Sequence, residues 1–232
     1  MKHRLGKFGS IFLALGIALS LTGAAFAHWS DTVQIEGTAE MGSLTLAFDF
    51  VEPPACDEYY LNPDTGALVE GEWLGKEVGD CDAWYEDLID DVHSLKKGYK
   101  TLIIEVDNAY PQYIVHTTFK LHNIGTIPFD ITEYIITGEK RDSTGAVIYN
   151  LLWHDPDGDY IGSLYEDVDG SGNVTGGDLE VINLEITNAL PYQIDPCRTN
   201  KAEIDLDFKQ AAEECHTYTI HVDIVAIQWN KA

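Results

Sequence analysis

Strict alternation of apolar and polar residues is the feature that most limits how this 232-residue chain can fold. From Tyr113 to His122, one parity carries Tyr, Val, Thr, Phe and Leu, and the other carries Ile, His, Thr, Lys and His. A two-residue repeat places alternate side chains on opposite faces of a β-strand, so this segment predicts a strand with one buried and one wet face. The pattern predicts an all-β fold, because it recurs in residues 44–50, 129–136, 147–152 and 218–224.

The first 27 residues have the three parts of a secretory signal peptide. Basic Lys2, Arg4 and Lys7 precede an apolar run at 11–21, and Ala25-Phe26-Ala27 forms a small-x-small cleavage site. The apolar run is shorter than the roughly 20 residues of a bilayer span, and no later segment is apolar enough to stop transfer. We therefore expect removal of residues 1–27, and a mature chain without a transmembrane segment that is secreted to the extracellular space or cell surface.

The mature amino terminus is itself a predicted strand. In residues 28–37, Trp29, Val33 and Ile35 share one parity, and most of the intervening residues are polar. A half-apolar strand at a newly released terminus can pair with a sheet edge of its own or of another subunit.

The carboxyl-terminal strand pattern changes partway. After Ile224 the apolar parity switches to Val225, Ile227 and Trp229, which predicts a β-bulge near Ile224 or burial of both faces. About 205 mature residues with ordinary hydrophobic content can bury one core, and all-β chains of this length commonly form one domain. We expect a single antiparallel β-sandwich spanning residues 28–232.

Acidic residues greatly outnumber basic ones. The chain holds 14 Lys and Arg against 39 Asp and Glu, and the three bases of the signal peptide are lost on cleavage, which leaves 11 against 39, a net charge of −28. This charge argues against nucleic acid and anionic membranes as partners and favours cations.

All four cysteines, Cys56, Cys81, Cys197 and Cys215, lie in the exported part. An even number of cysteines outside the cell indicates two disulfides, and the lack of a close C-x-x-C pair weakens a zinc site. Three connectivities are possible. We favour Cys56 with Cys81 and Cys197 with Cys215, because each bridge would then hold a loop-rich excursion between strands.

Residues 52–100 are predicted to be an insertion on the sandwich, held by one disulfide. The segment begins near Pro53 and Pro54 and is rich in Gly, Asp and Glu. Within it, residues 82–97 carry apolar side chains at three- and four-residue spacing and end at Gly98, which predicts a short amphipathic helix. These side chains are Trp84, Leu88, Val92 and Leu95.

Residues 167–178 match a twelve-residue calcium loop. Oxygen-bearing side chains occupy positions 1, 3, 5, 9 and 12, glycine occupies position 6, and position 7 can offer its backbone carbonyl. The predicted ligands are Asp167, Asp169, Ser171, Asn173, Thr175 and Asp178. The alternative is a solvated turn, because β-turns favour the same residue types.

A second acidic cluster lies a few residues upstream, at Asp155, Asp157 and Asp159. Solvent relieves repulsion among three such acids as readily as an ion does, so the cluster alone is a weak signal. Together with Glu166 and the calcium loop, it predicts an acidic calcium-binding region at 154–178. Extracellular calcium modules bind at about 10⁻⁴ to 10⁻³ M, so such sites would respond to the medium.

The sequence offers no catalytic constellation, and we expect no enzyme activity. It has no nucleophile elbow, no H-E-x-x-H helix and no glycine-rich phosphate loop after a predicted strand. His116 and His122 share the wetter face of one strand, but six residues separate them by about 20 Å, which is too far to share a metal.

Several stretches resemble the TasA and camelysin-like secreted proteins, whose signal peptides are processed by a SipW-type peptidase. The most specific are residues 26–32 and 42–46, around and after the cleavage site. Shorter similar stretches are 109–113, 123–128 and 226–230.

This resemblance implies a jelly-roll β-sandwich that polymerises into extracellular filaments of a biofilm matrix or cell surface. In such filaments the amino-terminal strand of one subunit completes a sheet in the next, so the partner is a second copy of the chain, with other matrix proteins as further partners. Trp29, Val33 and Ile35 would then form the polymer interface, and the alternative is that this strand folds back into its own sheet. Cannulae, the calcium-containing extracellular tubes of some archaea, would be a related outcome.

Two other functions compete with a structural subunit. Camelysin-like proteins have been described as metalloproteases, although this sequence shows no zinc constellation. A secreted adhesive or carbohydrate-binding module would use Trp73, Trp84 or Trp153 to stack on sugars, whereas packing within the protein is the simpler role for these tryptophans.

Overall fold

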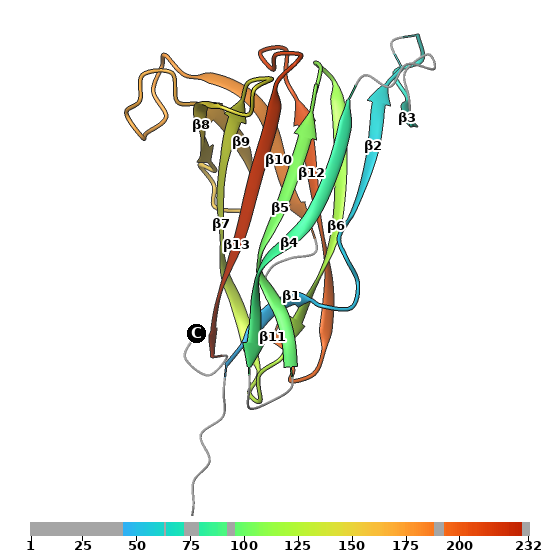
Figure 1. Cartoon of the computed structure of the whole chain (residues 1–232), viewed down its shortest axis with the longest axis vertical. Helices are drawn as coiled ribbons and strands as arrows, with labels where there is room; N and C mark the ends of the chain where they lie inside the picture. The colour runs from blue at the N-terminus through green and yellow to red at the C-terminus, as the bar shows by residue number, and fades with distance from the viewer. Residues whose placement is uncertain (1–43, 63, 72–78, 92–95, 188–192, 229–232) are drawn as a thin grey trace, which may run out of the picture. The chain divides into compact units, whose positions relative to one another are not determined.

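The computed structural model describes residues 44–62, 64–71, 79–91, 96–187 and 193–228, all within one compact unit, residues 42–232 (Figure 1). These residues form antiparallel strands and no helix, so none of them contributes a helix long and apolar enough to cross a membrane. The strands are β1 (Leu46–Asp49), β2 (Ala55–Leu61), β3 (Leu68–Glu70), β4 (Asp80–Asp91), β5 (Lys96–Asp107), β6 (Tyr113–Asn123), β7 (Phe129–Arg141), β8 (Val147–His154), β9 (Ile161–Glu166), β10 (Leu179–Thr187), β11 (Gln193–Ile194), β12 (Thr199–Phe208) and β13 (Thr217–Gln228).

Nine of these strands close into a barrel. The hydrogen-bonded order is β1-β5-β13-β7-β8-β9-β10-β12-β6, and β6 pairs back with β1. β4 lies beside β5, β11 beside β7, and β2 with β3 beside β6. The predicted all-β antiparallel class is confirmed. The strands form a closed barrel rather than the predicted sandwich of two sheets, because β1 pairs with both β5 and β6.

The closure at β1 is irregular for a geometric reason. β1 is antiparallel to both β5 and β6, yet nine strands in a ring cannot all alternate in direction. One strand must therefore cross its neighbours obliquely, and Figure 1 shows β1 running across the end of the barrel. Its contacts are short: Phe48 pairs with Tyr99 of β5, and Leu46 pairs with Asn123 of β6. A Cβ atom at Gly98 would overlap the Cβ of Ala47, so this crossing requires glycine.

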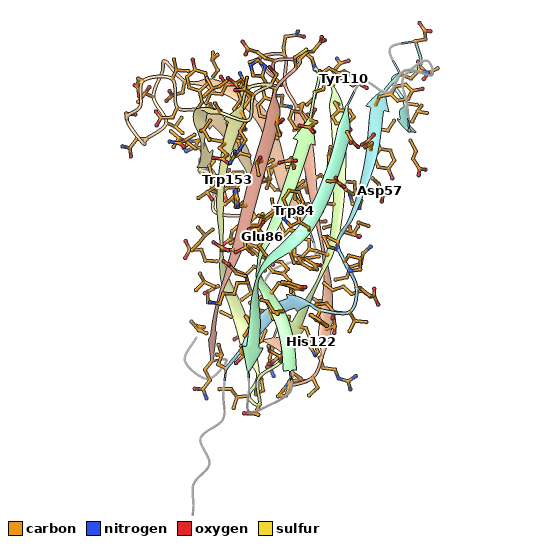
Figure 2. All side chains as sticks on the ribbon, in the orientation of Figure 1. Asp57, Trp84, Glu86, Tyr110, His122 and Trp153 are labelled. Carbon is orange, nitrogen blue, oxygen red and sulfur yellow. A yellow bond between two sulfur atoms is a disulfide. The ribbon has the colours of Figure 1, made fainter. Side chains whose placement is uncertain are left out.

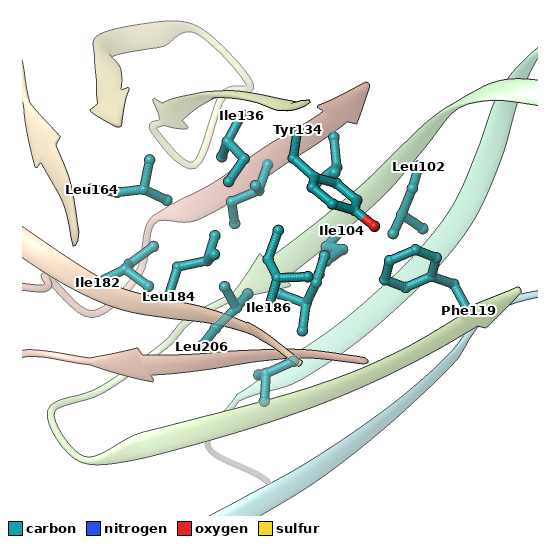
Figure 3. Packing of buried hydrophobic residues seen from close by; sticks show 14 of the residues in the cluster. Leu102, Ile104, Phe119, Tyr134, Ile136, Leu164, Ile182, Leu184, Ile186 and Leu206 are labelled. Atoms are coloured by element: carbon teal, nitrogen blue, oxygen red, sulfur yellow. The ribbon is translucent and has the colours of Figure 1, made fainter. Parts of the chain in front are cut away.

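The barrel interior is filled by the inward side chains of its strands. In β6 every second residue from Tyr113 to Asn123 is buried, so the predicted alternation is confirmed. Figure 3 shows these side chains meeting those of the opposite wall, among them Leu102, Ile104, Phe119, Leu164, Ile182, Leu184 and Leu206. Each side chain of this size contributes about 1.5–3 kcal/mol when fully buried, so the core supplies the main stabilising term.

The parity switch after Ile224 goes with partial burial of both faces, the second of the two predicted explanations, although a register shift lies close by, between Val225 and Ala226. Val225 pairs with Glu133 and Ala226 with Ile131, so the extra residue is Thr132, on β7 rather than on β13. The inward parity of β7 changes at this point, because Ile131 is buried before it and Tyr134 is buried after it. Residues 224–228 of β13 are half-buried on both faces.

The predicted helix at 82–97 is wrong, because the described part of this segment forms β4 and the start of β5. β4 pairs with β5 from Asp80 to Asp91. Cys81 is part of the core, and the alternate residues Ala83 and Tyr85 pack against it. The hydrogen-bonding edge of β5 therefore outweighs the helical spacing of the outward side chains, a case in which tertiary pairing overrides local propensity. Residues 92–95 lie outside the described residues.

The cysteine prediction is half right. Cys56 and Cys81 form a disulfide that joins β2 to β4. The predicted bridge between Cys197 and Cys215 is wrong. Both residues are exposed; Cys197 lies just before β12, and Cys215 lies after the turn that follows β12. A ten-residue strand spans about 33 Å, whereas the Cα atoms of a disulfide lie within about 7 Å.

Candidate metal centre

The predicted calcium loop connects β9 to β10 and is the orange loop in Figure 1. It begins directly after Glu166 at the end of β9 and ends at Asp178, just before Leu179 opens β10. The residues that follow the loop, 179–187, form the strand β10. The loop is thus held by a β-hairpin, and the helices that flank an EF-hand loop are replaced by strands.

Three carboxylates of the loop converge. Asp167, Asp169 and Asp178 each have one oxygen within 4.8 Å of the others. Asp167 is only 9% exposed, Asp178 is half-buried and Asp169 is exposed. Calcium takes six to eight oxygen ligands from carboxylates, carbonyls and water, so this donor set suits calcium, whereas zinc sites are rich in His and Cys.

Hydrogen bonds within the loop hold the carboxylates in place. Asp167 accepts hydrogen bonds from the backbone N–H groups of Ser171 at 3.0 Å and Gly172 at 3.1 Å. Asp178 accepts from the N–H groups of Val168 at 3.0 Å and Thr175 at 2.7 Å. Asp178, at predicted ligand position 12, therefore ties the end of the loop to its start, and Asp167, at position 1, holds the middle of the loop.

The Thr175 hydroxyl connects the carboxylates of Asp169 and Asp178. Its hydroxyl oxygen lies 3.1 Å from a carboxylate oxygen of Asp169 and 3.1 Å from one of Asp178. Hydrogen bonds from Ser171 and Thr175 lower the pKa of Asp169, so its carboxylate stays ionised at neutral pH. Positions 3, 9 and 12 of the predicted loop are thus neighbours in space.

The remaining two predicted ligands contact each other. The Ser171 hydroxyl donates to the Asn173 backbone carbonyl at 2.8 Å. That carbonyl is the predicted ligand at position 7, so an ion would compete with this hydrogen bond. The tight turn depends on Gly170 and Gly172, which have φ angles of 68° and 72° that most side chains disfavour.

An ion cluster anchors the base of the loop, and sequence reasoning missed it. Lys140 of β7 donates to Glu166 at 2.8 Å and to Glu213 at 2.7 Å. Lys140 is 1% exposed and Glu166 is 2% exposed, whereas the Glu213 side chain is 61% exposed. The lysine ammonium also lies 5.8 Å from the centre of the Tyr218 ring.

The charge state of this cluster follows from its hydrogen bonds. Burial opposes the charge of Lys140, but hydrogen bonds to Glu166 and Glu213 outweigh that effect and raise its pKa above the usual value. The hydrogen bond from Lys140 lowers the pKa of Glu213. A signal was present in the sequence, because Lys140 has the inward parity of Ile136 in β7 and Glu166 has that of Leu164 in β9.

The second acidic cluster is not part of this centre. Asp155, Asp157 and Asp159 precede β9, whereas the calcium loop follows it, and six residues of strand separate the clusters by about 20 Å. The Asp155 carboxylate accepts N–H hydrogen bonds from Gly158 at 2.8 Å and Tyr160 at 2.8 Å, as in a turn stabilised by aspartate. The two clusters therefore do not form one continuous edge.

Other predicted residues have structural contacts of their own. His116 pairs with Asp205 at 2.6 Å. Trp153, labelled in Figure 2, packs against the core, whereas Trp84 is half-buried on the outer face and donates from its indole nitrogen to Glu86 at 3.0 Å.

The predicted polymer-interface residues Trp29, Val33 and Ile35, and also Trp73, lie outside the described residues. No family model, no curated protein and no solved structure matches this chain.

Proposed function

We propose that the chain is a secreted structural subunit that polymerises head to tail into extracellular filaments or tubes, with calcium bound at residues 167–178. The observation that carries the calcium part is the convergence of Asp167, Asp169 and Asp178 on a hairpin loop. The polymer part rests on the half-apolar strand at 28–37 and on the resemblance to TasA-like proteins. A head-to-tail contact of this kind does not close on itself, so it generates filaments.

The charge of the subunit gives calcium a physical role. Copies that each carry −28 repel one another when they stack, and a divalent ion at the exposed side of the carboxylate cluster reduces that repulsion. The disulfide between Cys56 and Cys81 is compatible with an extracellular location, because such bonds persist in oxidising compartments.

Negative-stain electron microscopy of the chain starting at His28 tests this proposal. We expect ordered polymers in millimolar calcium, few in chelator at low ionic strength, and none from a variant lacking residues 28–37. Asp167→Asn with Asp178→Asn should need several-fold more calcium, whereas Asp155→Asn with Asp157→Asn is a charge-matched control. Monomers under every condition would contradict the proposal, and polymers that form equally well in chelator would contradict the role of calcium.

An adhesive or carbohydrate-binding module is the second candidate, and Trp84 favours it. This half-buried indole lies beside Glu86 and Ile103 on the wall of a surface pocket of about 500 Å³. Aromatic rings beside polar side chains suit sugar binding. Glycan binding by a monomer that never polymerises, lost in Trp84→Ala, would support this function over the first.

A further inference from the structure

A pocket of about 250 Å³ lies between β4 and residues 49–54, which end β1 and lead to β2. Its described lining is aromatic or apolar apart from one carboxylate. The aromatic members are Phe50, Trp84, Tyr85 and Tyr99, of which Trp84 is labelled in Figure 2, and the carboxylate belongs to Asp49. Pockets for drug-sized ligands measure roughly 300–1,000 Å³, so this pocket suits a single small group.

Three of the rings form one continuous series. The ring centres of Phe50 and Tyr99 lie 5.9 Å apart with their planes inclined by 16°, and those of Tyr99 and Tyr85 lie 5.7 Å apart and are inclined by 28°. Burial, together with the charges of Asp49 and Glu52, raises the pKa of Tyr85 to about 12, so its hydroxyl stays neutral at neutral pH. The pocket therefore has an uncharged wall of aromatic rings, whose faces carry partial negative charge.

Asp49 supplies a buried carboxylate beside these rings. It is 8% exposed, and one of its oxygens accepts a hydrogen bond from the Val51 N–H at 3.0 Å. Among the described residues, no Lys, Arg or His forms an ion pair with Asp49, whereas the nearby Glu52 pairs with Lys120. A buried carboxylate without a counter-charge is unfavourable, so the pocket favours a cation.

The lining decides which kind of cation fits. Calcium takes six to eight oxygen ligands, and a primary ammonium has three N–H donors to satisfy, whereas this pocket offers one carboxylate among rings and prolines. A quaternary ammonium group has no N–H donor, and it is attracted to ring faces within about 6 Å.

We propose that this pocket binds a quaternary ammonium group, with Asp49 as its counter-charge and the rings of the lining as its aromatic wall. The site is separate from the polymer and calcium functions proposed above. The excess of acidic over basic residues in the chain adds a general attraction for such a cation.

Isothermal titration calorimetry of the chain starting at His28, in chelator, tests the site. Choline is the probe, and 3,3-dimethylbutan-1-ol is the control, because it has the same shape with carbon in place of the charged nitrogen. We expect the alcohol to bind at least about tenfold more weakly, since it lacks the charge that Asp49 and the rings attract. Sedimentation with phosphatidylcholine vesicles distinguishes the source of the group. Co-sedimentation that choline competes away assigns a lipid head group, and its absence assigns a free quaternary amine.

Three variants probe the residues. Asp49→Asn should weaken choline binding at least about tenfold, because the bound cation loses its counter-charge. Phe50→Ala should weaken it about threefold or more, and little stability is at stake because this side chain is 46% exposed. Glu52→Gln is the charge-matched control: it removes the same charge close to Asp49 in the chain but outside the lining, so the affinity should change by less than about twofold.

Four outcomes overturn the inference. The first is no choline binding by the parent chain at tens of millimolar, and the second is equally tight binding of the alcohol, which would show an apolar pocket only. The third is unchanged affinity in both Asp49→Asn and Phe50→Ala when their urea midpoints match the parent chain. The fourth is an equal loss in Glu52→Gln and Asp49→Asn, which would show a general effect of charge. None of these results depends on polymers seen by electron microscopy, so the site and the proposed function can fail separately.

Discussion

Replacing Lys140 with methionine should be among the most destabilising single changes in the described chain. The substitution keeps an unbranched side chain in the core but leaves Glu166, which is 2% exposed, without its cation. Removing one partner of a buried ion pair costs about 3–5 kcal/mol, because the remaining charge must stay uncompensated or take up a proton. That loss is a large fraction of a typical stability of about 5–15 kcal/mol.

Urea denaturation of the chain starting at His28, at neutral pH, measures the effect. We expect the free energy of unfolding to fall by about 3–5 kcal/mol with little change in the slope, because the surface exposed on unfolding stays similar. Lys201→Met is the matched control. Lys201 pairs with Glu203 at 2.9 Å, but its side chain is 55% exposed, so the loss should stay below about 1 kcal/mol.

A double substitution separates the lost pair from the lost packing. Lys140→Met together with Glu166→Leu removes both buried charges, and replacement of a buried pair by apolar residues is often neutral or stabilising. We expect the double variant to recover most of the lost stability. If Lys140→Met costs no more than Lys201→Met, or if the second change brings no recovery, the reasoning about an uncompensated buried charge is refuted.

Three further predictions concern the disulfide between Cys56 and Cys81, the dependence of stability on pH, and the closure of the barrel at β1. Cys56→Ser with Cys81→Ser should lower stability by about 3 kcal/mol in urea denaturation, because the bridge closes a sequence separation of 25 residues. The pKa of Glu213 is lowered in the folded state, so the carboxylate stabilises the fold above its ordinary pKa of 4.5, and this stabilisation is lost as pH falls through the lowered value. In Glu213→Gln the free energy of unfolding should therefore depend less on pH in that acidic range. The change should be less than about 1 kcal/mol, because the side chain is mostly exposed. Gly98→Ala should displace β1, because the added Cβ atom would overlap Ala47. Hydrogen exchange of the Ile124 N–H, which donates to the Thr45 carbonyl just before β1 at 3.0 Å, should then become faster. Unchanged exchange would show that the closure at β1 tolerates a Cβ atom.

The candidate metal centre was largely visible in the sequence because its ligands lie within twelve residues. Asp167, Asp169 and Asp178 have the spacing of a calcium loop, and the structure brings their oxygens within 4.8 Å. The ion cluster beneath the loop was not visible as a unit. Lys140 and Glu166 are 26 residues apart, and only the side-by-side pairing of β7, β8 and β9 brings them together.

The sequence by itself determined which residues lie in strands such as 113–123, which of their side chains point inward, and that Cys56 can join Cys81. These properties are local or depend on a short loop, so periodicity and spacing carry them. Only the tertiary structure decided that the strands close into a barrel, that residues 82–91 form a strand, and that Cys197 lies far from Cys215. The reason is physical, because each of these outcomes depends on which strand edges pair. β5, for example, pairs with β13, which is distant in the chain, and with β4. These pairs form through backbone N–H and C=O groups that nearly every residue has, so the side-chain pattern does not specify them.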